Sequence, residues 1–380
     1  MNFKIFDDYI KEKIPHNKKL ISGSDSIEAI FEKYNFWYGN NFQKIPLKID
    51  DHYLHINYQI LEPLLTELNY VSKLIEASKS LTNKRKSLFK AEMFNNHLIE
   101  GYISSKRILN SIFEKNNHDL ASDQMVINIF NSMEYVLNKQ AINKDNLLIL
   151  YKRLTANLNL KEATLDGDYY RLNDVYISDH DWGVKAKHLD CLMDDLFIFI
   201  NDQNNVETKI IKAIIIHFYF EYLHPYYDFN GRTGRLLVLW FANNFESFEQ
   251  LSFFATAINL YRATYLKAFK RTRYNQTIDL TYFVAQILNI LIKQKQCYFN
   301  LVEIKKLVQD QFELSSIQKD VIMLIQANHN SYLKNQLIEK IFKLYEKDQI
   351  EKSIIEAQID QLLKYQILDQ NQKHYFLISK

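Results

Sequence analysis

A run of twelve residues from His224 to Arg235 gathers the side chains that nucleotide chemistry needs. It reads His-Pro-Tyr-Tyr-Asp-Phe-Asn-Gly-Arg-Thr-Gly-Arg. A histidine such as His224 can take a proton from an attacking hydroxyl, and Asp228 is a hard oxygen ligand of the kind that Mg²⁺ prefers. Arg232 and Arg235, three positions apart, would share one face of a helix and could fork onto phosphate oxygens. The run therefore indicates transfer of a nucleotide-derived group.

The backbone of this run also suits an anion. Asn230 and Gly231 stand where the run opens into an apolar stretch, and the first turn of a helix there would offer unpaired N–H groups to phosphate. Because the chain has only seven glycines, each one is worth reading as a special backbone position. The residues predicted to hold the nucleotide phosphates are Asn230, Gly231, Arg232, Thr233, Gly234 and Arg235.

The run resembles the signature of the Fic family, His-x-Phe-x-(Asp/Glu)-Gly-Asn-Gly-Arg-x-x-Arg. Two positions depart from it: Tyr226 stands where Phe is usual, and Phe229 stands where the first Gly is usual. A Phe tolerates a positive φ poorly, so the anion-binding turn is expected to differ at Phe229. The resemblance implies a mainly α fold with a helical Fic core, His224 as the catalytic base, Asp228 as the Mg²⁺ ligand and ATP as the bound nucleotide.

Two further segments resemble parts of the family that surround the active site. Residues 165–182 alternate and hold Gly167, which predicts a short β-hairpin. The resemblance implies a flap that pairs with the backbone of a target protein, and an ordinary surface hairpin is the alternative. Tyr261-Arg262-x-x-Tyr265 resembles the segment beside the adenine site, which implies that Tyr265 lies near the base, with core packing as the alternative. The expected flap residues are Val175, Tyr176, Ile177 and Ser178.

A second signature lies far upstream of the first. The segment from Asn96 to Glu100 and Gly101 resembles the family's inhibitory motif, (Ser/Thr)-x-x-x-Glu-(Gly/Asn), with Asn96 in the Ser/Thr position. The resemblance implies that Glu100 pairs with Arg235 and competes with the γ-phosphate of ATP, because two anions at close range repel each other. The alternative is an ordinary glutamate on a helix surface.

Apolar residues at a spacing of about 3.6, with only four prolines and seven glycines, predict a mainly helical protein. Residues 1–60 are rich in aromatic side chains and read as irregular, with short helices near 26–34. The 224–235 run is predicted to lie between two buried helices, which would hold its catalytic side chains rigidly in place. The predicted helices cover residues 60–77, 85–98, 123–137, 144–156, 188–200, 207–223, 236–241 and 253–269.

The last segment of the chain has a different character. Residues 314–380 predict three helices (317–326, 334–344 and 350–365) followed by two short strands (367–369 and 374–378), a pattern that resembles a winged helix. DNA binding is disfavoured because the segment contains no Arg and no excess of positive charge, and a protein-contact or homodimer module is the favoured alternative. The predicted domains are an N-terminal helical region with the inhibitory helix (1–110), the Fic core (111–300) and the winged-helix-like module (314–380).

Composition bounds the setting in which the protein works. A net charge of +2 argues against broad electrostatic binding to nucleic acid or acidic membranes. The cysteines, Cys191 and Cys297, are too few and too far apart for a disulfide framework or a metal cage, and both read as core residues. The N-terminus lacks the apolar stretch of a secretion signal, and no segment is long enough to span a bilayer. A cytoplasmic location is therefore expected, and an effector without a cleavable signal would look the same.

These observations predict a protein adenylyltransferase. It would move AMP from ATP, with Mg²⁺, to a Tyr, Thr or Ser hydroxyl of a target protein, and Glu100 would inhibit it. Three alternatives stay open. The protein could remove AMP with the help of Glu100, or transfer a different group such as UMP, phosphocholine or phosphate. It could also be a catalytically degenerate Fic scaffold that acts as a regulator or adaptor.

Overall fold

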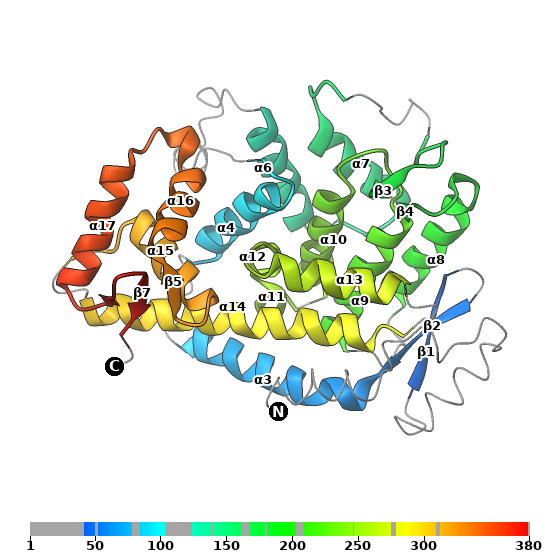
Figure 1. Ribbon diagram of the computed structural model, residues 1–380. Helices are drawn as coiled ribbons and strands as arrows, with labels where there is room; N and C mark the ends of the chain where they lie inside the picture. Colours follow the sequence, from blue (N-terminus) through cyan, green and yellow to red (C-terminus); the bar gives the residue numbers. More distant parts are fainter. Residues whose placement is uncertain are drawn as a thin grey trace.

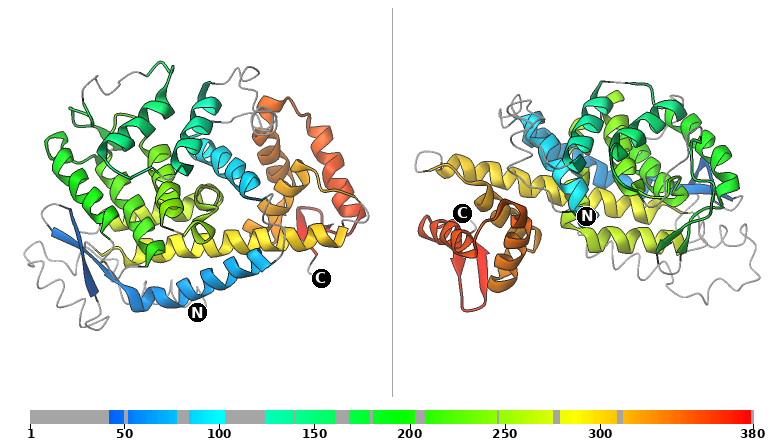
Figure 2. Two further views of the ribbon diagram at one scale, coloured as in Figure 1. Left: turned by 180° about the vertical axis from the view of Figure 1, so that it is seen from behind. Right: turned by 90° about the horizontal axis from the view of Figure 1, so that it is seen from above.

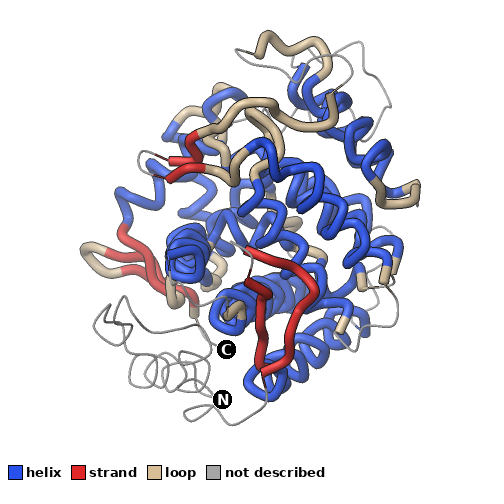
Figure 3. The backbone as a smooth tube through the Cα atoms, turned by 90° about the vertical axis from the view of Figure 1, so that its right-hand side faces the viewer, coloured by secondary structure: helices blue, strands red, loops and turns tan. Residues whose placement is uncertain are grey.

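The structure is a computed structural model that describes residues 42–49, 52–77, 84–102, 124–138, 140–160, 168–178, 181–202, 208–245, 247–274, 279–308 and 312–378. The fold is mainly α, as the sequence predicts, with short strands at separate places on the outside of the helical body (Figures 1 and 3). The predicted helices near 26–34 and the residue Gly167 lie outside the described residues. Within the described part of the chain, no helix combines the length and apolar content that crossing a bilayer requires.

Two buried helices form the centre of the fold and carry the loop between them. α9 (Lys209–Leu223) is buried on almost every face, so it lies inside the core rather than on its surface. α10 (Asn230–Asn244) packs against α9 and begins well before residue 236, where the sequence analysis starts it. The first two turns of α10 therefore contain the second half of the 224–235 run (Figure 1).

Of the other core helices, α4, α6, α7 and α8 contact this pair, whereas α3 packs on α14 (Thr281–Val308). The predicted boundaries of all five agree with the structure to within two residues. α6 packs on both α7 and α10, α8 packs on α9, and α4 packs on α12. A short 3₁₀ turn, η2 (Ala186–His188), leads into α8. The helices of this group are α3 (Tyr58–Ala77), α4 (Lys84–Ile99), α6 (Gln124–Leu137), α7 (Lys144–Thr155) and α8 (Leu189–Asn201).

The stretch predicted as one helix over residues 253–269 is two helices. α12 (Phe254–Leu260) and α13 (Arg262–Tyr274) are separated at Tyr261, whose φ of −111° and ψ of 35° leave the helical region. The single turn α11 (Phe248–Leu251) precedes them. The apolar spacing continues across the break, which is why the pattern does not reveal it.

The prediction of an irregular N-terminal segment is wrong for residues 42–57, which form a β-hairpin. β1 (Phe42–Ile49) pairs with β2 (His52–Asn57) in antiparallel fashion, and inward-facing residues such as Ile45 are fully buried. The register of the pair shifts between Ile45 and Lys48, where Pro46 has no N–H to give to the ladder. This irregularity interrupts the alternation by which a strand is recognised in sequence.

α14 (Thr281–Val308) is a long helix that the sequence analysis does not anticipate. It lies beside α3 and also contacts α12, α13 and α15 (Figures 1 and 2). Because these neighbours cover most of its faces, its apolar residues follow no single stripe. α14 connects the core to the C-terminal part of the chain.

The C-terminal part has a hydrophobic core of its own at one end of α14 (Figure 2). The predicted helices and the last two strands are present with shifts of at most two residues, whereas the short strand β5 is new. Its strands form an antiparallel sheet in the order β5-β7-β6. The elements are α15 (Ser316–Ala327), β5 (Ser331–Leu333), α16 (Lys334–Leu344), η3 (Glu346–Asp348), α17 (Lys352–Lys364), β6 (Leu368–Gln370) and β7 (His374–Leu377).

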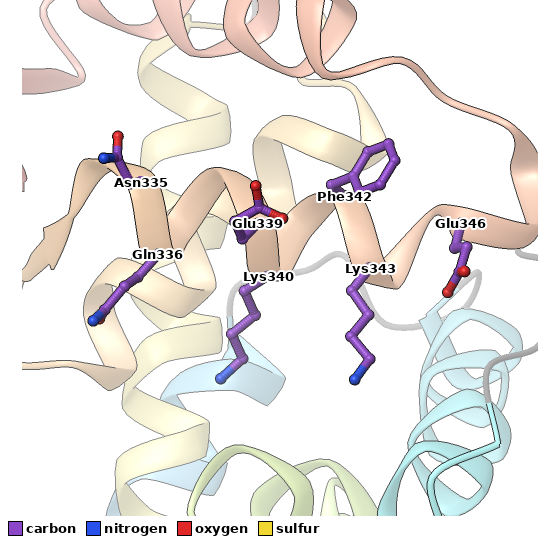
Figure 4. Close-up of a pocket in the computed structure, with 7 residues that line it drawn as sticks. All are labelled: Asn335, Gln336, Glu339, Lys340, Phe342, Lys343 and Glu346. Carbon is purple, nitrogen blue, oxygen red and sulfur yellow. The ribbon is translucent and has the colours of Figure 1, made fainter.

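A cavity of about 680 Å³ lies beside α16 (Figure 4), and no residue of the 224–235 run lines it. Carboxylates, ammonium groups and amides line it together with one aromatic ring. Since these charges are mixed in sign and include no histidine or cysteine, the cavity does not present a catalytic or metal-binding set. Its lining residues are Asn335, Gln336, Glu339, Lys340, Phe342, Lys343 and Glu346.

Candidate active site

The loop between α9 and α10 is held in one shape by its own polar groups. His224 caps the end of α9 with φ 51° and ψ 60°, and its N–H donates to the carbonyl of Phe220 at 3.0 Å. Asn230 braces the loop from the other side: its Oδ1 accepts from the N–H of Tyr226 at 2.9 Å, and its Nδ2 donates to the Tyr226 carbonyl at 2.8 Å. The side chain of Asn230 therefore shapes the loop instead of facing a ligand.

The N-terminus of α10 offers an anion site made of backbone. The first intrahelical hydrogen bond runs from the N–H of Thr233 to the carbonyl of Phe229 at 2.9 Å, so the N–H groups of residues 230–232 have no acceptor within the helix. The hydroxyl of Thr233 also donates to the Phe229 carbonyl, at 2.8 Å. Of the residues predicted to bind phosphate, Asn230 and Gly231 thus have backbone N–H groups without an acceptor in the helix, whereas Thr233 uses its N–H and its hydroxyl within the turn.

A carboxylate already lies at this helix terminus. A Cβ added to Gly231 would stand 2.5 Å from Oε1 of Glu100, so the Glu100 side chain fills the space that the missing Cβ leaves. The same oxygen accepts from Nη2 of Arg235 at 2.6 Å. The ion pair that the family resemblance implies is therefore present in the structure, against the positive end of α10.

Arg235 is buried, and α4 supplies most of its partners. Its Nε donates to Oδ1 of Asn96, and its Nη2 donates to the Asn96 carbonyl at 3.2 Å. Asn96, which replaces the Ser/Thr of the family motif, thus acts with Glu100 on one guanidinium. Burial by itself would raise the pKa of Glu100, but Arg235, with Arg232 and Arg262 beyond it, holds that pKa below its ordinary value.

The end of α4 fixes where Glu100 points. Gly101 has φ 77°, and the N–H of Tyr102 donates to the carbonyl of His97 at 3.1 Å, which is the left-handed glycine cap of a helix C-terminus. Glu92, deeper in the same helix, accepts from the N–H groups of Ala255 and Thr256 at 2.7 and 3.0 Å. Glu92 therefore fastens α4 to the N-terminus of α12, a role that nothing in the sequence around it reveals.

The turn at Phe229 keeps the conformation that a glycine would adopt. Phe229 has φ 64° and ψ 10°, so the expected change of the turn does not occur. Its ring is buried, and the guanidinium of Arg232 lies over it at 3.7 Å from the ring centroid. Nη1 of Arg232 also lies 3.1 Å from the sulfur of Met125. Arg232 is thus held by an aromatic ring, whereas Arg235 is held by a carboxylate.

Restoring the family's glycine at this position is expected to destabilise the protein. Phe229→Gly relieves a left-handed backbone that costs about 1 to 2 kcal/mol but removes a buried ring whose loss costs about 3 to 5 kcal/mol. The free energy of unfolding in urea should therefore fall by roughly 1 to 4 kcal/mol. Gln349→Gly, at an exposed residue with φ 56°, relieves the same kind of strain without losing burial, and should leave stability unchanged or slightly higher. A Phe229→Gly protein as stable as the wild type would contradict this balance.

A buried pair of titratable residues, which the sequence analysis does not single out, lies beneath Arg235. Glu221 of α9 lies against Gly234, and its Oε1 is 3.9 Å from Nδ1 of His217. Burial raises the pKa of Glu221 to about 8, with Arg235 opposing it, and burial lowers the pKa of His217 to about 3. Nε2 of His217 is 3.1 Å from the hydroxyl of Tyr265, which places Tyr265 in the core, the alternative reading of that residue.

The raised pKa of Glu221 predicts how stability varies with pH. Below about pH 4.5 the carboxyl is protonated in both states, and between there and about pH 8 only the unfolded chain ionises. Stability should therefore fall as pH rises through this window, by up to about 1.4 kcal/mol per unit. Glu221→Gln should match the wild type at low pH and exceed it at pH 8 in urea unfolding. The exposed control Glu62→Gln should show no such divergence, and parallel curves for Glu221→Gln would rule the effect out.

The predicted flap lies beside the His224 loop. β3 (Tyr176–Ser178) and β4 (Asp181–Trp182) pair in antiparallel fashion, and the N–H of Gly183 donates to the carbonyl of Val175 at 2.8 Å. Tyr176 is 61% exposed, so the outer strand offers an aromatic side chain to solvent. Of the predicted flap residues, Tyr176, Ile177 and Ser178 form β3, and Val175 lies just before it.

Asp228 fits the role of the single protein carboxylate that a nucleotide-bound Mg²⁺ needs. Its carboxylate is exposed at the mouth of the loop, and Oδ1 accepts from the N–H of Phe229 at 2.6 Å, which fixes its direction. The described residues contain no cluster of three or more metal-ligating side chains. Mg²⁺ bound together with a nucleotide needs only one or two carboxylates, because phosphate oxygens and waters complete its shell.

The fold and this loop define a known class of domain. Residues 141–242 match the family model described as Fic/DOC family, and this span contains the flap, α9 and the complete 224–235 run. The chain therefore carries a Fic/DOC family domain. Two relatives, both named protein adenylyltransferase Fic, support the match. The one from Drosophila ananassae is 22% identical over 187 residues, and the one from Drosophila mojavensis is 23% identical over 177 residues.

These likenesses cover different shares of the proteins compared. The two relatives match 47% and 44% of this chain but only 37% and 34% of their own lengths, so about two thirds of each relative has no counterpart in the match. Over most of its length the chain also shares the fold of a solved Fic family protein from Desulfovibrio desulfuricans. That likeness has a TM-score of 0.51 at 17% identity and covers 89% of this chain and 99% of the other.

Proposed function

We propose that this protein transfers AMP from ATP to a hydroxyl group of a target protein. The observation that carries the proposal is the place of Glu100. A carboxylate paired with Arg235 lies at the N-terminus of the helix that follows the His224 loop, and this supports a phosphate site at the same place, where an anion of the chain itself now lies. The similarity of part of this chain to relatives named protein adenylyltransferase Fic also supports the proposal.

The residues of the loop would each have a separate role in the reaction. The N–H groups of residues 230–232 and the guanidinium of Arg235 would receive the phosphates of ATP. His224 would take the proton of the acceptor hydroxyl, whose oxygen bonds to the α-phosphorus while the bond to pyrophosphate breaks. Asp228 would hold Mg²⁺, which supplies positive charge to the phosphates. The target keeps AMP, and pyrophosphate leaves.

We further propose that Glu100 inhibits this transfer. Arg235 is buried and already satisfied by Glu100 and Asn96, so a phosphate can pair with it only if the Glu100 carboxylate moves away. The two anions cannot share one guanidinium at close range without strong repulsion. Removal of AMP from a modified target is the second candidate, because the same carboxylate could orient a water at this place.

The C-terminal part fits a protein-contact module better than a DNA-binding one. Its three helices and the β5-β7-β6 sheet suit the winged-helix prediction, but the exposed face of α17 carries both acids, such as Glu356 and Asp360, and lysines. Nζ of Lys347 in η3 also lies 4.1 Å from the ring centroid of Tyr102, next to the inhibitory segment. A DNA titration should show weak binding without a steep dependence on salt; tight, salt-sensitive binding would reverse this assignment.

Two labelled forms of ATP test the transferred group directly. With the label on the α-phosphate, the protein itself or a target should become labelled, and with the label on the γ-phosphate it should not. Chelation of Mg²⁺ by EDTA should stop the labelling. Label from the γ-phosphate would indicate a kinase, and loss of label from a previously modified target would indicate AMP removal.

A further inference from the structure

A buried arginine outside the 224–235 run joins the catalytic loop to the flap. The side chain of Arg171 is fully buried, and its guanidinium donates to backbone carbonyls. Nε donates to the carbonyl of His224 at 2.8 Å, and Nη2 reaches the carbonyl of Leu223 at 3.4 Å. Both acceptors lie at the C-terminal end of α9, where the helix dipole favours a cation.

The same guanidinium also holds both ends of the flap. Nη1 donates to the carbonyl of Asn173, just before β3, at 2.8 Å, and Nη2 donates to the carbonyl of Val184, just after β4. Gly183 leaves room for this contact, because a Cβ there would stand 2.9 Å from Nη2. One rigid, planar group thus connects His224 with the two segments from which the flap extends.

Neighbouring hydrogen bonds also join the residues before the flap to the His224 loop. The N–H of Arg171 donates to the carbonyl of Pro225 at 2.9 Å. The hydroxyl of Tyr227 accepts from the N–H groups of Leu172 and Asn173 at 3.2 and 3.3 Å. Residues 171–173, which lead into the flap, therefore contact the His224 loop at successive positions. Arg171 contacts both the loop and the flap.

Burial of this cation is costly and is not offset by a buried carboxylate. The nearest acid, Asp174, is 4.0 Å from Nη1 and its side chain is 47% exposed. Burial lowers the pKa of Arg171 accordingly. An apolar side chain would fill the same space at less cost. What the guanidinium adds is a fixed geometry among four carbonyls, one of which belongs to a histidine in the left-handed region at φ 51°.

We propose that Arg171 is a positioning residue for the transfer, because it sets the distance between the His224 ring and the acceptor hydroxyl that the flap presents. This inference rests on the proposed function. Errors of about 1 Å in such a distance can lower a rate by roughly 100-fold. Arg171 acts through the backbone of His224 and the flap and does not itself touch the substrate.

The test compares Arg171→Lys with its parent, Glu100→Gly, in which the site is open. Lysine keeps the positive charge but cannot reach four carbonyls in fixed directions. The readout is the rate of labelling of protein by α-labelled ATP divided by the rate of AMP release to water. The ratio is taken at equal concentrations of folded protein, because a chain that labels another copy of itself is both enzyme and acceptor. It should fall by roughly 10- to 100-fold, while the Kd for ATP stays unchanged. Gly183→Ala, which crowds Nη2, should lower the ratio in the same direction.

The matched control is Arg271→Lys, which loses a hydrogen bond to Tyr282 at 2.9 Å in another part of the core. It should leave the ratio unchanged even if it lowers the melting temperature. Equal losses of labelling and AMP release in Arg171→Lys would mean that the residue serves only stability, and would overturn the proposal.

Hydrogen exchange separates this inference from the proposed function. In Arg171→Lys, amides of the His224 loop and of residues 175–178 and 181–183 should lose protection together, whereas Arg271→Lys should leave these segments protected. If the parent labels nothing, the adenylyltransferase proposal fails, and the exchange result still decides whether Arg171 couples loop and flap. Unchanged protection in both segments would reject the coupling.

Discussion

Replacing Glu100 with glycine is expected to raise labelling by α-labelled ATP by roughly 10- to 100-fold. The estimate follows from one buried, charge-assisted hydrogen bond, worth about 1.5 to 3 kcal/mol, at about 1.4 kcal/mol for each factor of ten. The Glu100→Gly change leaves Arg235 bound to Asn96 and opens the space beside Gly231. The phosphates of ATP can then approach both the guanidinium and the N-terminus of α10. Initial rates of self-modification, measured at equal protein concentration, provide the comparison.

Two variants show whether the charge or the size of the Glu100 side chain causes the inhibition. Glu100→Gln keeps the volume of the side chain and removes its charge, so it should give an intermediate rate because repulsion of the phosphate is gone while part of the space stays filled. Glu303→Gln breaks an exposed ion pair with Lys306 and should change nothing. If Glu100→Gly bound ATP yet labelled no faster than the wild type, Glu100 would not be an inhibitor. Slower removal of AMP from a modified protein in the same variant would favour the second candidate function.

The local parts of the site could be predicted from sequence, since they depend on residues that are neighbours in the chain. The spacing of Asn230, Arg232 and Arg235 along one helix belongs to this kind, and so does the cap at Gly101. The pairing of Glu100 with Arg235 spans 135 positions and came only from the family resemblance. Where no motif marks a distant contact, as for the contact between Glu92 of α4 and the N-terminus of α12, the sequence offers no signal.

Two further features escaped prediction for identifiable physical reasons. The expected change of the turn at Phe229 did not occur, because burial of the ring and its contact with Arg232 outweigh the strain of a positive φ. Glu221 looked like one more residue at the end of an apolar helix. Its raised pKa arises from burial beneath α10, which depends on how two helices pack and not on the residues beside it.

Replacing His224 with alanine is expected to abolish transfer, with a loss of roughly 100- to 10,000-fold in rate, the usual contribution of a positioned general base. The measurement is labelling by α-labelled ATP in the Glu100→Gly protein with and without His224→Ala. The backbone at this position has φ 51°, a strain that alanine meets to a similar degree, and the N–H of residue 224 still reaches the Phe220 carbonyl. The melting temperature should therefore change little.

Binding of ATP should survive the loss of His224, and this separates a missing base from a damaged site. The phosphates depend on the N-terminus of α10 and on Arg235, whose partners lie on α4 and not on the His224 side chain. The Kd for ATP in the presence of Mg²⁺ should thus be the same in both proteins, while labelling is lost in only one. His329→Ala, at an exposed turn in the C-terminal part, removes an imidazole elsewhere and should keep full labelling. Transfer that persists in a folded His224→Ala protein would require another residue to take the proton. Asp228, the carboxylate of the same loop, would be the next to replace.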